Sequence, residues 1–96
     1  MSARQLREEV FVAEHPVLRT RTLFVLPVIP EDAPYVIREG IARRRVAATT
    51  GECPCGAVVD YGDRRPGEVG VGEVRHERSC PASTHKLIRA CRRWSL

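Results

Sequence analysis

The pattern of apolar positions first predicts a strand in the N-terminal half of the chain. Residues 21–29, RTLFVLPVI, hold its densest apolar run. Val and Phe favour strands, so we expect extended chain here. Pro27 lies inside the run and cannot donate a ladder hydrogen bond, which predicts an edge position or a bulge.

Upstream of this strand the pattern is ambiguous. The start SARQ has the form of a capping box, and Leu6 and Val10 are four residues apart, which predicts a short helix over residues 3–9. The VFVA that follows is equally compatible with extended chain. Pro16 keeps the residue before it out of the helical region, so His15 should end any helix and lie in a surface loop.

The clearest predicted element is a helix in EDAPYVIREGIARRRVAA, over residues 32–49. Asp32 can cap its start, and Pro34 falls in the first turn, where a missing N–H is harmless. Gly51 is expected to end it. Four positions recur at helical spacing, namely Ile37, Ile41, Arg44 and Ala48.

The composition of the chain changes near residue 50. All four cysteines and six of the seven glycines follow Thr50. We interpret this as a boundary between an N-terminal part, residues 1–50, and a C-terminal Cys/His part, residues 51–96. Within the second part, residues 57–61 and 69–76 are β-like runs joined by the turn formers GDRRPG, which predicts a hairpin.

A second helix is predicted near the end of the sequence, through Trp94. Ser79 or Ser83 can cap it, and Leu87, Cys91 and Trp94 fall on one face. We expect Cys91 to belong to the core, because it shares that face with two apolar side chains. The predicted fold class is α+β: a strand and a helix, then a hairpin and a helix of the ββα or zinc-ribbon type.

Length and charge limit the classes of function. A chain of 96 residues has little apolar surface for a second lobe, so a metal or disulfide staple is plausible on size alone. No apolar run approaches the roughly 18 residues of a membrane span, and the polar start lacks a signal-peptide pattern. We therefore expect a cytoplasmic protein with reduced thiols, which favours metal binding. The net charge of +4 suits a polyanionic partner.

The motif CPCG predicts half of a metal site. Structural zinc takes four Cys or His ligands, and two tight turns can supply them as pairs. Cys53 and Cys55 are the first pair, and Gly56 can adopt the positive φ that lets amides approach a thiolate. The second pair is expected after the hairpin, where RHERSC supplies His76 and Cys80 with three residues between them.

Other ligand sets stay open at this point. His85 lies one turn after Cys80 and could replace His76 as a ligand, and Cys91 could do the same. An iron–sulfur cluster would use all four thiols, those of Cys53, Cys55, Cys80 and Cys91. The C-x-C spacing is shorter than that of most zinc knuckles.

The Cys/His motifs also carry a resemblance. GECPCGA is followed about twenty residues later by VRHERSCPA, and a helix of the form YVIREGIARRRVAA precedes both. Over residues 34–82 this pattern resembles small zinc-finger-like proteins of actinobacteria and their bacteriophages. The resemblance implies a metal site and a phage or actinobacterial source. It implies ligands at Cys53, Cys55, His76 and Cys80, and no activity.

The sequence lacks several common enzyme motifs. H-E-x-x-H, G-x-S-x-G and a phosphate-binding glycine loop are absent, and Glu77 directly follows His76, unlike the H-x-E of zinc deaminases. Four ligands of the structural type are available, three of them thiolates. We therefore expect no catalysis and no small-molecule substrate.

Two basic clusters suggest what the protein contacts instead. They are Arg43, Arg44 and Arg45 at a helix end, and Lys86, Arg89, Arg92 and Arg93 on the last helix. The expected function is a zinc-stabilised module that contacts nucleic acid or the transcription machinery through these residues. The alternative is a phage virion protein, or a phage inhibitor of a host protein, that uses residues 1–50 as its interface.

Overall fold

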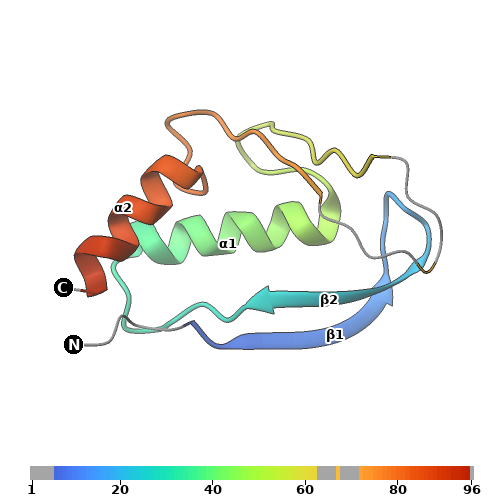
Figure 1. The fold of residues 1–96 in the computed structure, drawn as a ribbon, viewed down its shortest axis with the longest axis horizontal. Helices are drawn as coiled ribbons and strands as arrows, with labels where there is room; N and C mark the ends of the chain where they lie inside the picture. The colour runs from blue at the N-terminus through green and yellow to red at the C-terminus, as the bar shows by residue number, and fades with distance from the viewer. Residues whose placement is uncertain (1–5, 63–66, 68–71, 96) are drawn as a thin grey trace.

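The computed structural model describes residues 6–62, 67 and 72–95. Two antiparallel strands, β1 (Glu8–Glu14) and β2 (Arg21–Pro27), precede two helices, α1 (Tyr35–Thr50) and α2 (Thr84–Ser95). Helix α1 runs alongside the strands, and α2 lies against the end of α1 where that helix begins (Figure 1). The fold is therefore α+β, as the sequence predicts.

The first two strands form a hairpin in which Phe11 pairs with Phe24. Their rings stack with centroids 5.1 Å apart. The helix predicted over residues 3–9 is wrong from Glu8 onward, where the chain is a strand, and residues 3–5 lie outside the described part. A single i, i+4 apolar pair is a weak local signal, and pairing with β2 overrides it.

Strand β2 confirms the predicted strand but ends at Pro27 rather than at residue 29. Pro27 pairs with Glu8 at the end of the two-stranded sheet, where both strands are edges. This position suits a residue that cannot donate to a ladder.

Helix α1 begins three residues later than predicted. Pro34 is its N-cap, without a side-chain capping bond, so Asp32 does not cap the helix. The cause is the proline, which restricts the residue before it to extended conformations, so Ala33 cannot be helical. Gly51 ends the helix as predicted, with φ of 90° and an N–H that donates to the Ala47 carbonyl.

The larger apolar core lies where α1 and α2 meet. Its buried residues are Ala33, Ile37, Ile41 and Leu87, with Ile29, Ala90, Cys91 and Trp94 packed against them. The hydroxyl of Ser83 caps α2 by accepting the N–H of Lys86 at 3.3 Å. Gly40 allows the close approach, since a Cβ there would lie 2.5 Å from the Pro81 carbonyl oxygen.

Between the helices, the described residues fold back over the end of α1 and form isolated bridges rather than strands (Figure 1). Among the described residues, the two runs of the predicted second hairpin meet at one isolated antiparallel bridge, Asp60 with Glu73. A second bridge, Glu52 with Val58, closes the turn that holds Cys53 and Cys55. Most of the connecting turn of the predicted hairpin, and the start of its second run, lie outside the described residues. The bridge between Asp60 and Glu73 brings the two Cys/His segments together.

His15 is not the surface residue that its loop position predicts, because only 2% of it is exposed. Its Nδ1 accepts the N–H groups of Val17 and Leu18 at 3.1 and 3.2 Å, which places the ring proton on Nε2. Nε2 lies 3.2 Å from the Ala48 carbonyl oxygen and 2.8 Å from the Tyr61 hydroxyl. His15 thus links the hairpin turn to the end of α1 and to the segment after it.

Candidate metal centre

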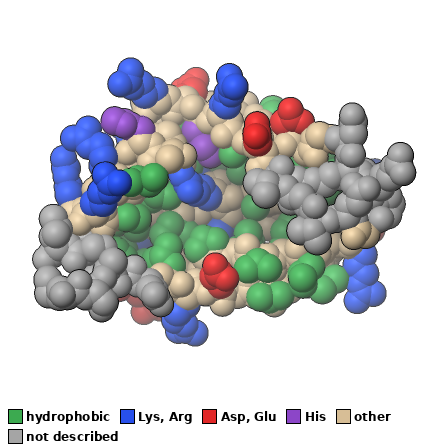
Figure 2. Space-filling model, viewed as in Figure 1, with side chains coloured by type: hydrophobic (Ala, Val, Ile, Leu, Met, Phe, Trp, Pro, Cys, Tyr) green, Lys and Arg blue, Asp and Glu red, His purple; other side chains and the backbone are tan. Residues whose placement is uncertain are grey.

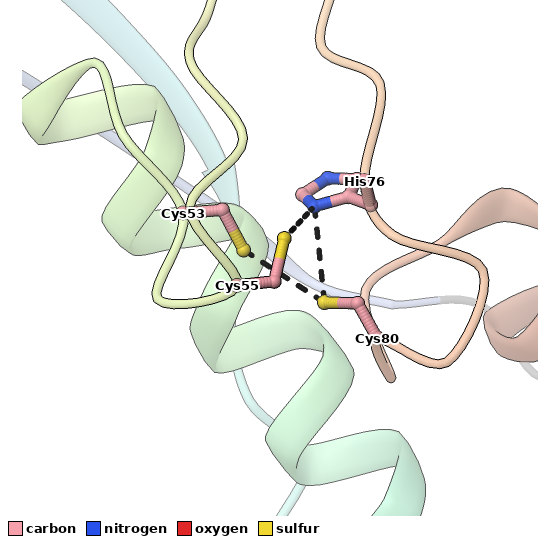
Figure 3. Close-up of side chains that lie close together, drawn as sticks. All are labelled: Cys53, Cys55, His76 and Cys80. Atoms are coloured by element: carbon pink, nitrogen blue, oxygen red, sulfur yellow. Dashed lines mark hydrogen bonds between the residues drawn. The ribbon is translucent and has the colours of Figure 1, made fainter.

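Four side chains converge where the chain leaves α1 and where it approaches α2 (Figure 3). They are Cys53, Cys55, His76 and Cys80, and their ligand atoms all lie within 4.8 Å of one another. The Cys53 and Cys80 sulfurs are 3.8 Å apart. Nδ1 of His76 lies 3.7 Å from the Cys55 sulfur and 3.9 Å from the Cys80 sulfur. The chain therefore holds a Cys/His group that could bind a metal ion, at the residues that the motifs indicate.

The first half of the group is a tight turn. The Gly56 N–H donates to the Cys53 carbonyl at 2.8 Å, and the Cys53 N–H donates to the Ala57 carbonyl at 2.8 Å. Gly56 has φ of 95°, the positive value that the sequence predicts for it. In this conformation the Ala57 N–H can donate to the Cys55 sulfur, which stabilises a thiolate.

The second half is a turn just before α2. The Cys80 N–H donates to the Glu77 carbonyl at 2.9 Å, and the Ser83 N–H donates to the Cys80 carbonyl at the same distance. The backbone thus reverses between His76 and Cys80 and brings both side chains to one side. The Arg44 Nε, which donates to the Ala82 carbonyl at 2.9 Å, anchors this segment to α1.

The four ligand candidates differ in burial and in proton affinity. Cys53 and Cys80 are only 1% and 3% exposed, whereas Cys55 and His76 are half-buried. Burial raises the pKa of the Cys53 thiol to about 11. The backbone N–H of Glu77 donates to the Cys55 sulfur and lowers its pKa to about 6, with help from Ala57 and His76. A bound cation would replace the proton on Cys53 and keep that buried thiol ionised.

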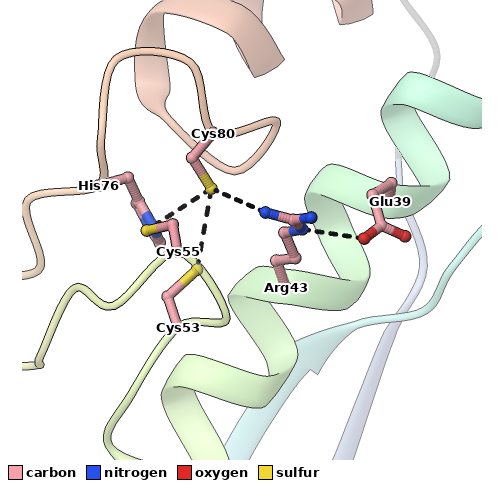
Figure 4. Close-up of polar contacts among 6 residues, drawn as sticks. All are labelled: Glu39, Arg43, Cys53, Cys55, His76 and Cys80. Atoms are coloured by element: carbon pink, nitrogen blue, oxygen red, sulfur yellow. Dashed lines mark hydrogen bonds and ion pairs between the residues drawn. The ribbon is translucent and has the colours of Figure 1, made fainter.

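Arg43 is a neighbour of this group that the sequence pattern assigns elsewhere. Its Nη1 donates to the Cys80 sulfur at 3.8 Å, and its Nε donates to Glu39 at 2.9 Å (Figure 4). The hydrogen bond to Glu39, with a second to Cys80, raises the pKa of Arg43. The i, i+4 spacing of Glu39 and Arg43 was the only local signal of this arrangement.

The remaining candidate ligands lie elsewhere. Cys91 packs against the apolar core of α1 and α2, as predicted, and is not a member of the Cys/His group. The iron–sulfur alternative needs Cys91 as its fourth thiol. Because Cys91 lies outside the Cys/His group, the four thiols do not form one ligand set in the described residues. His85 is exposed in the first turn of α2 and is also outside the group.

The two basic clusters differ in the structure. Arg43, Arg44 and Arg45 do not share a face, because successive residues point about 100° apart around a helix. Arg45 donates to the Pro27 carbonyl at 2.7 Å and forms an ion pair with Glu9, on the hairpin side of α1. By contrast, the α2 cluster is solvent-exposed throughout, at Lys86, Arg89, Arg92 and Arg93.

Comparisons with models of protein families, with curated proteins and with solved structures return no match. Within the part of the chain that the structure describes, no helix combines the length and apolar character that crossing a membrane requires.

Proposed function

We propose that Cys53, Cys55, His76 and Cys80 bind one Zn²⁺ ion. A tetrahedral zinc with bonds of about 2.3 Å to sulfur and 2.0–2.1 Å to nitrogen places two sulfurs about 3.8 Å apart and a sulfur and a nitrogen about 3.6 Å apart. Three of the six separations between the ligand atoms, 3.8, 3.7 and 3.9 Å, match these values, and all six are within 4.8 Å. This match is the observation that carries the proposal. It assigns Nδ1 of His76 as the nitrogen ligand.

The ion would be structural. Four protein ligands fill a tetrahedron, whereas a catalytic zinc keeps a position for water or substrate. Three thiolates also neutralise the charge of the ion, which weakens it as a Lewis acid. We therefore propose a non-catalytic protein, in which the metal joins the turn after α1 to the segment before α2.

Metal content of the purified chain tests this assignment. We expect one zinc per chain by elemental analysis, and exchange for Co²⁺ should give the intense d–d absorption of a tetrahedral thiolate site. Cys53→Ser should abolish that spectrum, while the matched variant Cys91→Ser should retain it. A chain that binds neither ion, or a Co²⁺ spectrum that survives Cys53→Ser, would refute the site.

The partner that we propose is nucleic acid, contacted through α2. Lys86, Arg89 and Arg93 line a shallow groove of about 280 Å³ with Val36 and Ala90. Figure 2 shows Lys and Arg side chains on this part of the surface. None of the four basic residues of α2 is buried in the core, so their charges are accessible to phosphates. Arg43, Arg44 and Arg45 already contact groups within the protein, and we leave them out of the proposed interface.

Salt dependence tests the nucleic-acid proposal. Each phosphate neutralised on duplex DNA contributes about 0.9 to the slope of log K against log salt, so four cations predict a slope of about −3 to −4. Arg89→Ala should reduce the slope by about one, whereas Arg38→Ala, at an exposed position of α1, should leave it unchanged. Absence of binding to DNA and RNA in low salt would exclude this function.

A protein–protein interaction role is the second candidate. The observation that favours it is the hairpin, where four aliphatic side chains are between 49% and 63% exposed: Val10, Val12, Leu23 and Val25.

A further inference from the structure

The outer face of the hairpin is an exposed block of aliphatic side chains. Residues on one face of a strand alternate with those on the other, and Phe24 and Leu26 face the core. The intervening positions therefore face outward. Val10 pairs with Val25 across the strands, and Val12 pairs with Leu23. Figure 2 shows hydrophobic side chains at the surface along the strands.

The two ends of this outer face carry different charged side chains. Glu14 of β1 pairs with Arg21 of β2 beyond Val12 and Leu23, on the same face. At the other end Glu8 pairs with Pro27. The residues of β1 on the outer face are therefore Glu8, Val10, Val12 and Glu14. Their partners on β2 are, in the same order, Pro27, Val25, Leu23 and Arg21. Arg19 in the hairpin turn also reaches Glu14, at 3.7 Å between solvent-exposed groups.

We propose that this face pairs with the same face of a second copy of the chain, related by a two-fold axis parallel to the strands. Such an axis lays β1 over the β2 strand of the other copy. Val10 then meets the partner's Val25, and Glu14 meets the partner's Arg21. Because the contact is isologous, the ion pair forms twice. Two small sheets packed in this way resemble the aligned layers of a β-sandwich, about 10 Å apart.

Charge distinguishes this arrangement from the other symmetric one. A two-fold axis perpendicular to the strands would lay β1 over the partner's β1 and bring Glu14 against the partner's Glu8. It would also leave Arg21 opposite Pro27, without a counter-charge. Like charges placed in contact disfavour a complex, so the pattern of Glu8, Glu14 and Arg21 selects the parallel axis.

The face is small, which limits the affinity. A two-stranded hairpin presents little area, and interfaces below about 1,200 Å² belong to weak or transient complexes. We expect a dimer with Kd of about 1–100 µM. The proposal does not depend on the nucleic-acid contact, since α2 is a separate element from the hairpin.

Sedimentation equilibrium of the full, metal-loaded chain tests the dimer. The weight-average mass should rise from one chain to two between about 1 µM and 1 mM. Val25→Lys should weaken association at least tenfold, because Val25 is 52% exposed and lies in the block. Val58→Lys is the matched control, an exposed valine at 68% outside the sheet, and should not change it. A monomer at 1 mM, or equal weakening by both variants, overturns the proposal and leaves the face to another protein.

A charge-swap mixture tests the orientation without altering the apolar block. Glu14→Arg alone and Arg21→Glu alone should each associate more weakly than the wild type, since each homodimer would then bring like charges together twice. An equimolar mixture of the two variants should form a heterodimer at least as tight as the wild-type dimer, because both contacts become Arg with Glu. Thermal unfolding of each variant confirms that it is folded. Tighter self-association of Glu14→Arg would show the perpendicular axis, and absence of a heterodimer would overturn the parallel one.

Discussion

Helix α1 packs in two different ways along its length. Near its start, Ile37 and Ile41 bury large aliphatic side chains against Leu87 of α2. Near its end, Ala47 packs with Cys53, Cys80 and Ala82. Half of the buried residues of this second cluster are proposed metal ligands, and the others are alanines. The start of the helix is therefore stabilised by apolar burial, while its end has too little apolar area for that mechanism alone.

The largest expected effect comes from removing the metal. Structural zinc binding contributes on the order of 10 kcal/mol in small fingers, far more than two buried alanines can supply. Cys80→Ser, or chelation of the wild type, should therefore disorder the Cys/His segments and leave α1 packed against the hairpin. Hydrogen exchange measures this, because the amides of Cys53, Gly56 and Cys80 should lose protection while those of β1 and β2 keep theirs. If these three amides kept their protection after complete metal removal, the cluster of Ala47, Cys53, Cys80 and Ala82 would be stable without the ion.

Substitution of Gly40 and of Gly56 tests the same contrast between the two ends of α1. Gly40 is required by close packing between the helices, and Gly56 by the backbone conformation of the turn at the Cys/His group. A Cβ at Gly40 would meet the Pro81 carbonyl oxygen at 2.5 Å and the Leu87 side chain at 2.9 Å. Although alanine is the better helix former, this overlap should make Gly40→Ala destabilising by about 1–3 kcal/mol in denaturant unfolding. Gly56 has open space around it but φ of 95°, so Gly56→Ala should cost about 1–2 kcal/mol through backbone strain. A stabilising Gly40→Ala would show that α2 does not pack closely on α1.

Arg43 connects the two modes of packing, because it lies on α1 and donates to a proposed ligand. An arginine that donates to the Cys80 sulfur offsets part of the negative charge of a thiolate there, and outer partners of this kind typically change metal affinity by 10–100-fold. Arg43→Gln should weaken metal affinity about tenfold in a chelator competition. Arg38→Gln, on an exposed face of the same helix, is the matched control. Equal affinities for the two variants would mean that Arg43 serves only its ion pair with Glu39.

The positions of the Cys/His group could be predicted from sequence because tight turns are local. In Cys53-Pro54-Cys55-Gly56, the proline and the glycine define the backbone within four residues, and H-x3-C does so for the second pair. The end of α1 at Gly51 could be predicted for the same reason, since a single glycine in the left-handed conformation is enough to end a helix. The fold class followed from the α1 periodicity and the β2 run.

Features that depend on distant partners could not be predicted. His15 looks like a loop residue, yet it contacts Tyr61, 46 positions away along the chain. Glu8 could start a strand only because β2 pairs with it. The three consecutive arginines formed one cluster in the sequence, and the helix turns them toward Glu39, Ala82 and Glu9. Such contacts require the tertiary arrangement, which neither spacing nor composition contains.

The smallest expected effect is at Cys91, the one cysteine that packs against the apolar core near the start of α1. It is half-buried against the core of α1 and α2, so Cys91→Ala should remove only a little packing, about 1 kcal/mol in denaturant unfolding. Metal stoichiometry should stay the same, because no ligand is lost.

Cys55→Ala is the matched variant, because it makes the same change of side chain at another half-buried position. It should abolish stoichiometric metal binding, since two thiolates and one imidazole leave the tetrahedron incomplete. If Cys91→Ala lowered the metal content instead, the ligand set would have to include a thiol of the apolar core, and the division of α1 into two modes of packing would fail.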